Sequence, residues 1–160
     1  MRYFLVLMLA ALLASCTPVI SKGVLKEVER GITVDMVQKD PAAFTGRKTL
    51  WGGVIIASEN LENFTRIEVL ETGLAWDLTP HTEDYGASKG RFLIDATGYL
   101  DTAIFKKGKK LTTAGTVNGI IVKKIGKMDY AYPIITPIEM RLFEPPPLPP
   151  PSIFYLQTPY

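Results

Sequence analysis

The sequence is poor in the side chains that build most reactive centres. Its 160 residues contain one cysteine and one histidine, so the chain has neither two thiols for an internal disulfide nor two imidazoles for a zinc site. The serines lie outside any Gly-x-Ser-x-Gly turn, and no glycine spacing matches a phosphate-binding loop. These absences predict that the protein is not an enzyme and that it carries no metal or other cofactor.

Excess charge and long apolar runs are also scarce. The formal net charge is +2 at pH 7, far from the strongly basic surface of nucleic-acid-binding proteins, so we expect no nucleic-acid partner. No stretch after the N-terminus approaches the roughly 18 to 20 apolar residues that cross a bilayer. Beyond that N-terminal run the composition is that of an ordinary soluble domain.

The N-terminal run ends at the only cysteine. Residues 3–13 are apolar, and the small Ala14 and Ser15 come directly before Cys16. This order is a lipobox: it predicts a signal peptide over 1–15 and a mature chain that begins at a lipidated cysteine. An idle thiol in an uncleaved helix, or an ordinary secretory cut nearby, would be the alternatives.

The predicted anchor is a diacylglycerol group with further acyl chains such as palmitate. One acyl chain binds a membrane only marginally, whereas two or more hold it stably. Thr17 follows Cys16, and the absence of Asp at that position favours the outer membrane over the inner one. Residues 16–32 contain proline, glycine and a charged stretch, which predicts a lipidated tether.

Residues 33–143 are predicted to form one β-rich domain. The apolar side chains after Thr33 predict a short helix, whose first turn the Thr33 hydroxyl would cap as an acceptor. Alternating or apolar stretches predict strands at 49–57, 64–70, 91–96, 110–117, 120–124, 130–135 and 138–143. Gly52 and Gly53 predict a bulge, a strong bend or a close approach of another backbone in the first strand. The Trp51 ring would pack in the core and fill the space that the glycines leave.

Turn signals divide the second half of this domain. Asn118 and Gly119 predict a hairpin turn, and Pro137, which cannot donate to a sheet ladder, separates the last two strands. Five to seven short strands without helical crossovers predict a mainly β fold. It would be a small Greek-key, OB-like β-barrel with one short N-terminal helix.

The chain ends in a proline-rich tail, residues 144–160. Consecutive prolines favour a polyproline II segment that serves as a semi-rigid spacer. Recognition of its PxxP pattern by an aromatic groove is the alternative.

The single histidine lies in a loop that also carries aromatic and acidic residues. Trp76, His81 and Tyr85 are the candidates for a ligand face, because aromatic rings beside polar groups are typical of small binding sites. A histidine near carboxylates could also act as a general base or bind a metal. A metal site would need a second histidine or a free cysteine, and the sequence has neither. A solvated connecting loop is the simpler alternative.

A lysine cluster is the second candidate site. It comprises Lys106, Lys107, Lys109 and Lys110. Such a cluster can attract anionic headgroups or polymers. A solvated rim of hairpin ends would be equally basic.

Several short motifs, taken in order, resemble the Slp family of outer-membrane lipoproteins, which is named for a starvation-inducible member. They are DP at 40–41 with FTGR at 44–47, WGGVI at 51–55, GRF at 90–92, GYLD at 98–101, FKKG at 105–108, LTTAG at 111–115 and IGKMDYAYP at 125–133. The resemblance implies an outer-membrane lipoprotein with a compact OB-like barrel and no established catalytic role. The proline-rich tail departs from the compact ending of that family.

The sequence therefore predicts a lipid-anchored protein of the cell envelope whose domain faces the periplasm. A structural or partner-binding role, with another envelope protein as partner, is the first hypothesis. A module that binds a small molecule or glycan on the barrel face is the second.

Overall fold

The computed structural model describes residues 18–81 and 85–144. The predicted signal peptide, Cys16 and the tail from residue 145 onward lie outside this range. Among the residues described, no helix is long and apolar enough to cross a membrane.

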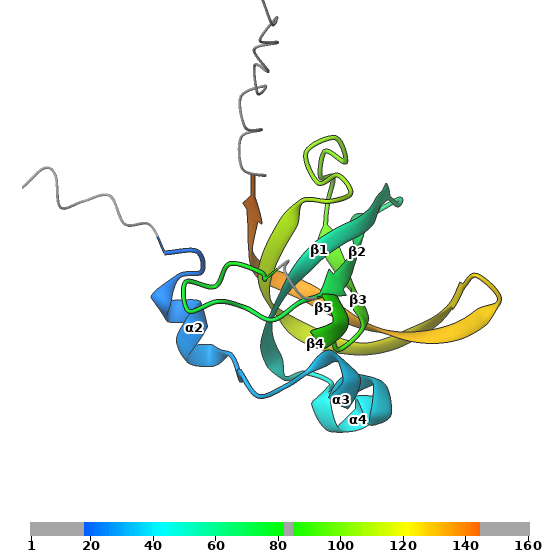
Figure 1. Ribbon diagram of the computed structural model, residues 1–160, viewed down its shortest axis with the longest axis horizontal. Helices are drawn as coiled ribbons and strands as arrows, with labels where there is room; N and C mark the ends of the chain where they lie inside the picture. Colours follow the sequence, from blue (N-terminus) through cyan, green and yellow to red (C-terminus); the bar gives the residue numbers. More distant parts are fainter. Residues whose placement is uncertain (1–17, 82–84, 145–160) are drawn as a thin grey trace, which may run out of the picture.

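Five strands close into a barrel (Figure 1). They are β1 (Lys48–Asn60), β2 (Phe64–Glu71), β3 (Arg91–Thr97), β4 (Lys110–Ile125) and β5 (Met128–Phe143). The order around the barrel is β1-β2-β3-β5-β4, with β3 and β5 parallel and the other neighbours antiparallel. This five-stranded closure confirms the predicted mainly β, OB-like barrel.

The alternation of apolar side chains builds the barrel interior. In β2, Thr65, Ile67 and Val69 are buried, because residues two apart share one face of a strand. Trp51 is also in the core, as predicted, and its ring meets Phe92 edge-on with centroids 5.1 Å apart. The full set of buried core residues is Ile32, Val34, Val37, Trp51, Ile55, Ile67, Val69, Phe92, Ile94, Leu111, Val117 and Ile135.

The two glycines after Trp51 serve close approach, one of their predicted roles. A Cβ on Gly53 would lie 1.9 Å from the Leu70 carbonyl oxygen, and a Cβ on Gly52 would lie 2.4 Å from Leu74 Cδ2. They allow β2 and the following loop to approach β1, so the space they leave is not filled by the tryptophan.

The predicted helix is α3 (Val34–Lys39), and a single further turn, α4 (Pro41–Phe44), follows it. Val34 and Val37 point into the core. The predicted cap is wrong: Thr33 donates its hydroxyl to Asp35 Oδ1 at 2.7 Å and makes no capping bond. Thr33 nevertheless occupies the N-cap position of α3.

A further helix, α2 (Lys22–Glu27), lies within the stretch predicted as a tether. Ile20 is fully buried and forms a second apolar cluster with Leu50 and Ala114. The described part of this stretch, residues 18–32, therefore packs on the barrel wall.

The predicted hairpin turn at Asn118 and Gly119 is wrong. Strand β4 continues through both residues with a register shift, and Gly119 has a positive φ of 87°. The chain reverses instead at Gly126 and Lys127, where Gly126 has a φ of 60°. A glycine with positive φ suits either a bulge or a turn, so the local signal is ambiguous.

The predicted break at Pro137 is also wrong. Strand β5 runs without interruption, and the register shifts between Ala114 and Gly115, with Gly115 opposite Pro137. The shift lets the strand absorb a residue that has no amide hydrogen to donate.

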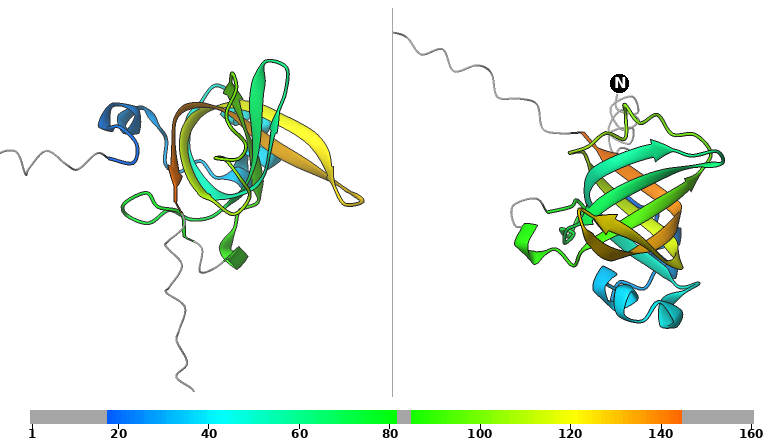
Figure 2. Two further views of the ribbon diagram at one scale, coloured as in Figure 1. Left: turned by 90° about the horizontal axis from the view of Figure 1, so that it is seen from above. Right: turned by 90° about the vertical axis from the view of Figure 1, so that its right-hand side faces the viewer.

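Together β4 and β5 extend beyond the barrel as a two-stranded arm, residues 118–133 (Figures 1 and 2). β1 pairs with β4 only as far as Thr116, and β3 pairs with β5 only at Ile134 and Ile135. The arm strands therefore pair only with each other. The arm and α2 lie on opposite sides of the barrel (Figure 2).

Candidate functional site

The loop of residues 72–81 folds back over the outside of the barrel. Leu78 has a positive φ of 67°, and its carbonyl accepts a hydrogen bond from Thr112 Oγ1 at 2.7 Å. At the end of the loop the His81 amide donates to the Gly73 carbonyl at 2.8 Å. The bond from Thr112 fixes the loop against β4, and the bond between His81 and Gly73 closes the loop on itself. A recess lies on either side of the loop.

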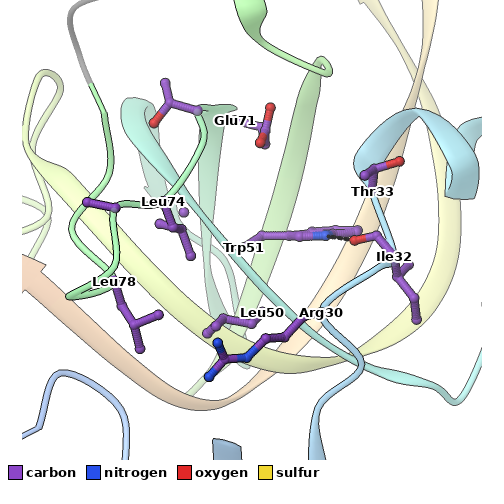
Figure 3. A pocket seen from close by; sticks show the side chains of 11 residues that line it. Arg30, Ile32, Thr33, Leu50, Trp51, Glu71, Leu74 and Leu78 are labelled. Carbon is purple, nitrogen blue, oxygen red and sulfur yellow. Dashed lines mark hydrogen bonds between the residues drawn. The ribbon is translucent and has the colours of Figure 1, made fainter.

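The first recess, called the loop pocket here, has a volume of about 260 Å³ (Figure 3). Its walls combine the side chains of Leu50, Trp51 and Leu74 with the polar groups of Arg30 and Glu71. The Trp51 indole donates to the Ile32 carbonyl at 2.8 Å, which holds the ring in place at the floor.

Two polar groups of the loop pocket are unusual. Burial raises the pKa of Glu71 above its ordinary value, against the opposing effect of the Lys89 amide, which donates to this carboxylate at 2.6 Å. The Thr72 hydroxyl is buried and has no hydrogen-bond partner among the described residues. Since buried hydroxyls are nearly always paired, an unpaired hydroxyl in the pocket wall is unusual.

The second recess, called the anchor-side groove here, lies between α2 and the same loop. It has a volume of about 460 Å³. Its lining residues are Pro18, Val19, Ile20, Lys22, Leu25, Trp76, Asp77 and Leu78. Trp76 lies at the edge of the groove and is 96% exposed. It is the most exposed large apolar residue among those described.

The structure brings together two of the three predicted ligand-face residues. Trp76 and His81 line one shallow depression of about 270 Å³ together with Lys110, whereas Tyr85 lies outside its lining. The His81 side chain is exposed and has no hydrogen-bond partner among the described residues. Within residues 18–81 and 85–144 no group of three histidine, cysteine or acidic side chains is placed to hold a metal. The ligand face stays a prediction.

The four clustered lysines do not share one environment. Lys106 and Lys107 are exposed, but the Lys109 side chain is only 10% exposed and pairs with Glu144 at 2.8 Å. Lys110 faces the depression beside His81. A contact of these lysines with an anionic surface stays a prediction, and the burial and ion pair of Lys109 leave Lys106 and Lys107 as the more accessible members.

Sequence reasoning missed the arm as a site. Ile120, Val122 and Met128 are 36%, 59% and 74% exposed there. Placing the turn at residue 118 left Ile120 and Val122 on a short return strand and Met128 outside any strand. In the arm, Ile120 and Val122 lie on one face, and Met128, which pairs with Ile125, lies on the other. The signal that could have found the arm is Gly126, because a glycine at the first of two turn residues suits a type II′ hairpin.

These features define a class of protein: a small closed Greek-key barrel that carries recesses beneath a surface loop and a projecting arm. The model of the outer membrane lipoprotein Slp family matches residues 13–159. The chain belongs to this family and is therefore an outer-membrane lipoprotein, held at the membrane by lipid. The match includes most of the proline-rich tail, so the expected departure of the tail from the family is wrong.

A similar curated protein is the uncharacterized lipoprotein YeaY of Escherichia coli (strain K12). It is 28% identical to this chain over 99 residues, which are 62% of this chain and 50% of the relative. The chain thus matches half the length of that relative.

Proposed function

We propose that acyl chains on Cys16 anchor the protein in the outer membrane, that the barrel faces the periplasm, and that the arm binds another envelope protein. The role is non-catalytic. The observation that carries the proposal is the arm, which exposes apolar side chains and whose strand edges pair with no other strand among the described residues.

The chemistry of the arm suits a protein partner. Val122 and Met128 are apolar and exposed, and a methionine adapts its shape to irregular surfaces. In the distal half, the outer edges of β4 and β5 pair with no other strand among the described residues. Such an edge can accept an added strand through main-chain hydrogen bonds.

Lysines lie beside the exposed apolar side chains on both faces of the arm. Lys127 lies at the turn without an ion-pair partner among the described residues, while Lys123 and Lys124 pair with Glu59 and Asp129 at 3.7 and 2.9 Å. Basic side chains next to apolar ones favour a partner that carries acidic groups.

Photo-crosslinking in intact cells tests the arm. A benzophenone side chain in place of Lys127 is expected to give one reproducible protein adduct, and the same group in place of the exposed Tyr99 is expected to give none. Introducing Val122→Asp and Met128→Asp together should abolish the Lys127 adduct without changing the melting temperature. An adduct that survives this double substitution, or no reproducible adduct, would overturn the binding role.

The anchor has its own test. Cys16→Ser is expected to prevent incorporation of radiolabelled palmitate and to release the protein from the membrane fraction. Continued labelling of the serine variant would contradict the assignment of the lipid to this residue.

One observation favours a second function, the binding of a small molecule or glycan. It is the unpaired Thr72 hydroxyl in the loop pocket, next to a half-buried carboxyl group and apolar walls. A compound that raises the melting temperature of the wild-type protein but not of Thr72→Val would support this role. If every active compound stabilises both proteins equally, the loop pocket is not its site.

A further inference from the structure

We infer that the anchor-side groove lies against the membrane surface and that Trp76 enters the headgroup region of the phospholipid leaflet. The inference rests on the proposed lipidation of Cys16. The interaction surface comprises Pro18, Val19, Lys22 and Leu25 on one wall of the groove, and Trp76 and Leu78 on the other.

Chain length limits where the bilayer can be. Cys16 precedes Pro18 by two residues, and a fully extended chain spans about 3.5 Å per residue, so the lipid attachment lies within about 7 Å of Pro18. Pro18 itself lines the groove. Ile20 is fully buried on the barrel wall, so the chain cannot lengthen this short connection without unpacking that residue.

The side chains at the rim of the groove suit a lipid surface. Trp76 is 96% exposed although its ring is large and apolar. Indole rings favour the membrane interface, where the ring leaves water while the N–H keeps a polar partner. The groove offers partly exposed aliphatic side chains next to this ring, at Val19, Leu25 and Leu78.

The charges near the groove agree with phosphate headgroups. Lys22 and Lys26 are exposed and have no ion-pair partner among the described residues. Asp77 is the acidic member of the lining, and its carboxylate accepts a hydrogen bond from the Thr79 amide at 3.0 Å. Free lysines near an anionic surface add attraction to the insertion of the ring.

This contact would also orient the arm. α2 and the loop lie on one side of the barrel and the arm lies on the other (Figures 1 and 2). With the groove on the leaflet, the arm points away from the membrane, toward any periplasmic partner.

Fluorescence quenching by brominated lipid tests the contact in the full-length lipidated protein. The protein is reconstituted into vesicles of phosphatidylethanolamine and phosphatidylglycerol, brominated in the upper part of the acyl chains. The chain has two tryptophans, and Trp51 is buried in the barrel as an internal reference. We expect bromine to quench the Trp76 emission, and the quenched component to disappear in Trp76→Phe.

A matched control moves the indole to the opposite side. Val122→Trp in the Trp76→Phe background places an exposed indole on the arm, and its emission should stay unquenched. Unquenched Trp76 in protein that co-floats with the vesicles, or equal quenching at residue 122, would overturn the inference. Wild-type protein that fails to co-float would instead contradict the anchor itself, so the two failures are distinguishable.

The contribution of the ring is measurable without the anchor. In the mature chain, residues 16–160, carrying Cys16→Ser, Trp76→Ala is expected to weaken partition into the same vesicles roughly tenfold, the effect of removing one partly inserted aromatic side chain. Equal partition of the two proteins would contradict insertion of the ring.

Discussion

At the scale of single residues, Trp51 connects the N-terminal segment to the barrel. Its ring packs against Phe92 inside the core, and its indole N–H reaches the Ile32 carbonyl at 2.8 Å. Thr49 Oγ1 also donates to that carbonyl, at the longer distance of 3.4 Å. The tryptophan therefore contributes both apolar burial and the stronger of two bonds to one buried acceptor.

Replacing Trp51 with Phe should retain most of the packing and lose this bond. We expect the free energy of unfolding to fall by about 1 to 2 kcal/mol, because the buried Ile32 carbonyl keeps only the weaker donor. Urea unfolding followed by circular dichroism measures the change. Trp76→Phe, at the exposed tryptophan, should shift stability by less than about 0.5 kcal/mol, and equal losses in the two variants would contradict this role.

Glu71 makes stability depend on pH. Burial raises the pKa of Glu71 above its ordinary 4.5, so the folded state binds more protons than the unfolded state between these two values. The stabilisation that this carboxyl gives the folded state is therefore fully present below its ordinary pKa. It is lost as the pH rises through the pKa of Glu71 in the folded state. Glu71→Gln keeps an oxygen for the Lys89 amide and removes the buried charge.

The stability of Glu71→Gln relative to wild type is expected to rise between about pH 4 and pH 7, by no more than about 1.4 kcal/mol for each unit of pKa shift. Urea midpoints at several pH values measure it. Asp77→Asn is the control of opposite sign, since the Thr79 amide lowers the pKa of Asp77. The loss of stability of Asp77→Asn relative to wild type should become smaller as the pH falls. Parallel pH profiles for wild type and Glu71→Gln would contradict the prediction.

At the scale of elements, close approach between neighbours sets where the strands can bend. Gly53 lets the Leu70 backbone come so close that a Cβ at this position would lie 1.9 Å from the Leu70 carbonyl oxygen. Gly119 and Gly126 adopt positive φ for two different purposes, a register shift and a turn. The same residue type thus serves pairing, bulging and reversal, depending on what lies opposite.

Gly53→Ala is expected to cost about 3 kcal/mol or more, because the new methyl group meets fixed backbone and must push β1 and β2 apart. Gly98→Ala is the matched control: Gly98 has a φ of 81° and no atom within 4 Å of the new methyl, so only left-handed strain of about 1 kcal/mol is added. Chemical denaturation of both variants measures the difference. Equal costs would mean that β1 relaxes around the clash.

At the scale of the whole molecule, the barrel wall has apolar clusters on both sides. One fills the interior, and the other holds Ile20 and the residues around α2 against Leu50 and Ala114. The Ser21 amide adds a hydrogen bond to Glu139 Oε2 at 2.9 Å. The segment next to the anchor is thus attached to the outside of a barrel that closes without it.

Ile20→Asp should release this segment and leave the barrel folded, because a buried unpaired carboxylate is costly only where the outer cluster forms. Hydrogen exchange should accelerate at the amides of Leu25 and Glu29, which bond Ser21 and Lys48. Protection in the five strands should persist. Gly23→Ala, with open space around the new methyl, should leave exchange in the segment unaccelerated. Loss of protection throughout the barrel would show that the segment and the barrel unfold as one unit.

Much of the architecture was predictable because it depends on local period. Strand β2 alternates strictly, and one face of it is buried as its pattern predicts. The arm and the two recesses were not predictable in the same way. Asn118 and Gly119 satisfy the local requirements of a hairpin turn, and only the pairing of β4 with β5 on both sides of them makes the site a bulge.

The sequence by itself determined the mainly β content and the alternation of buried and exposed side chains, since this periodicity needs no knowledge of distant neighbours. The sequence also contains the lipobox that ends at Cys16, which agrees with the match to a family of lipoproteins. Only the tertiary structure decided where functional surfaces lie. Trp76 enters a groove with Pro18, and the arm projects on the far side, because segments distant in sequence meet on the closed barrel. Barrel closure is a long-range property that no local pattern encodes.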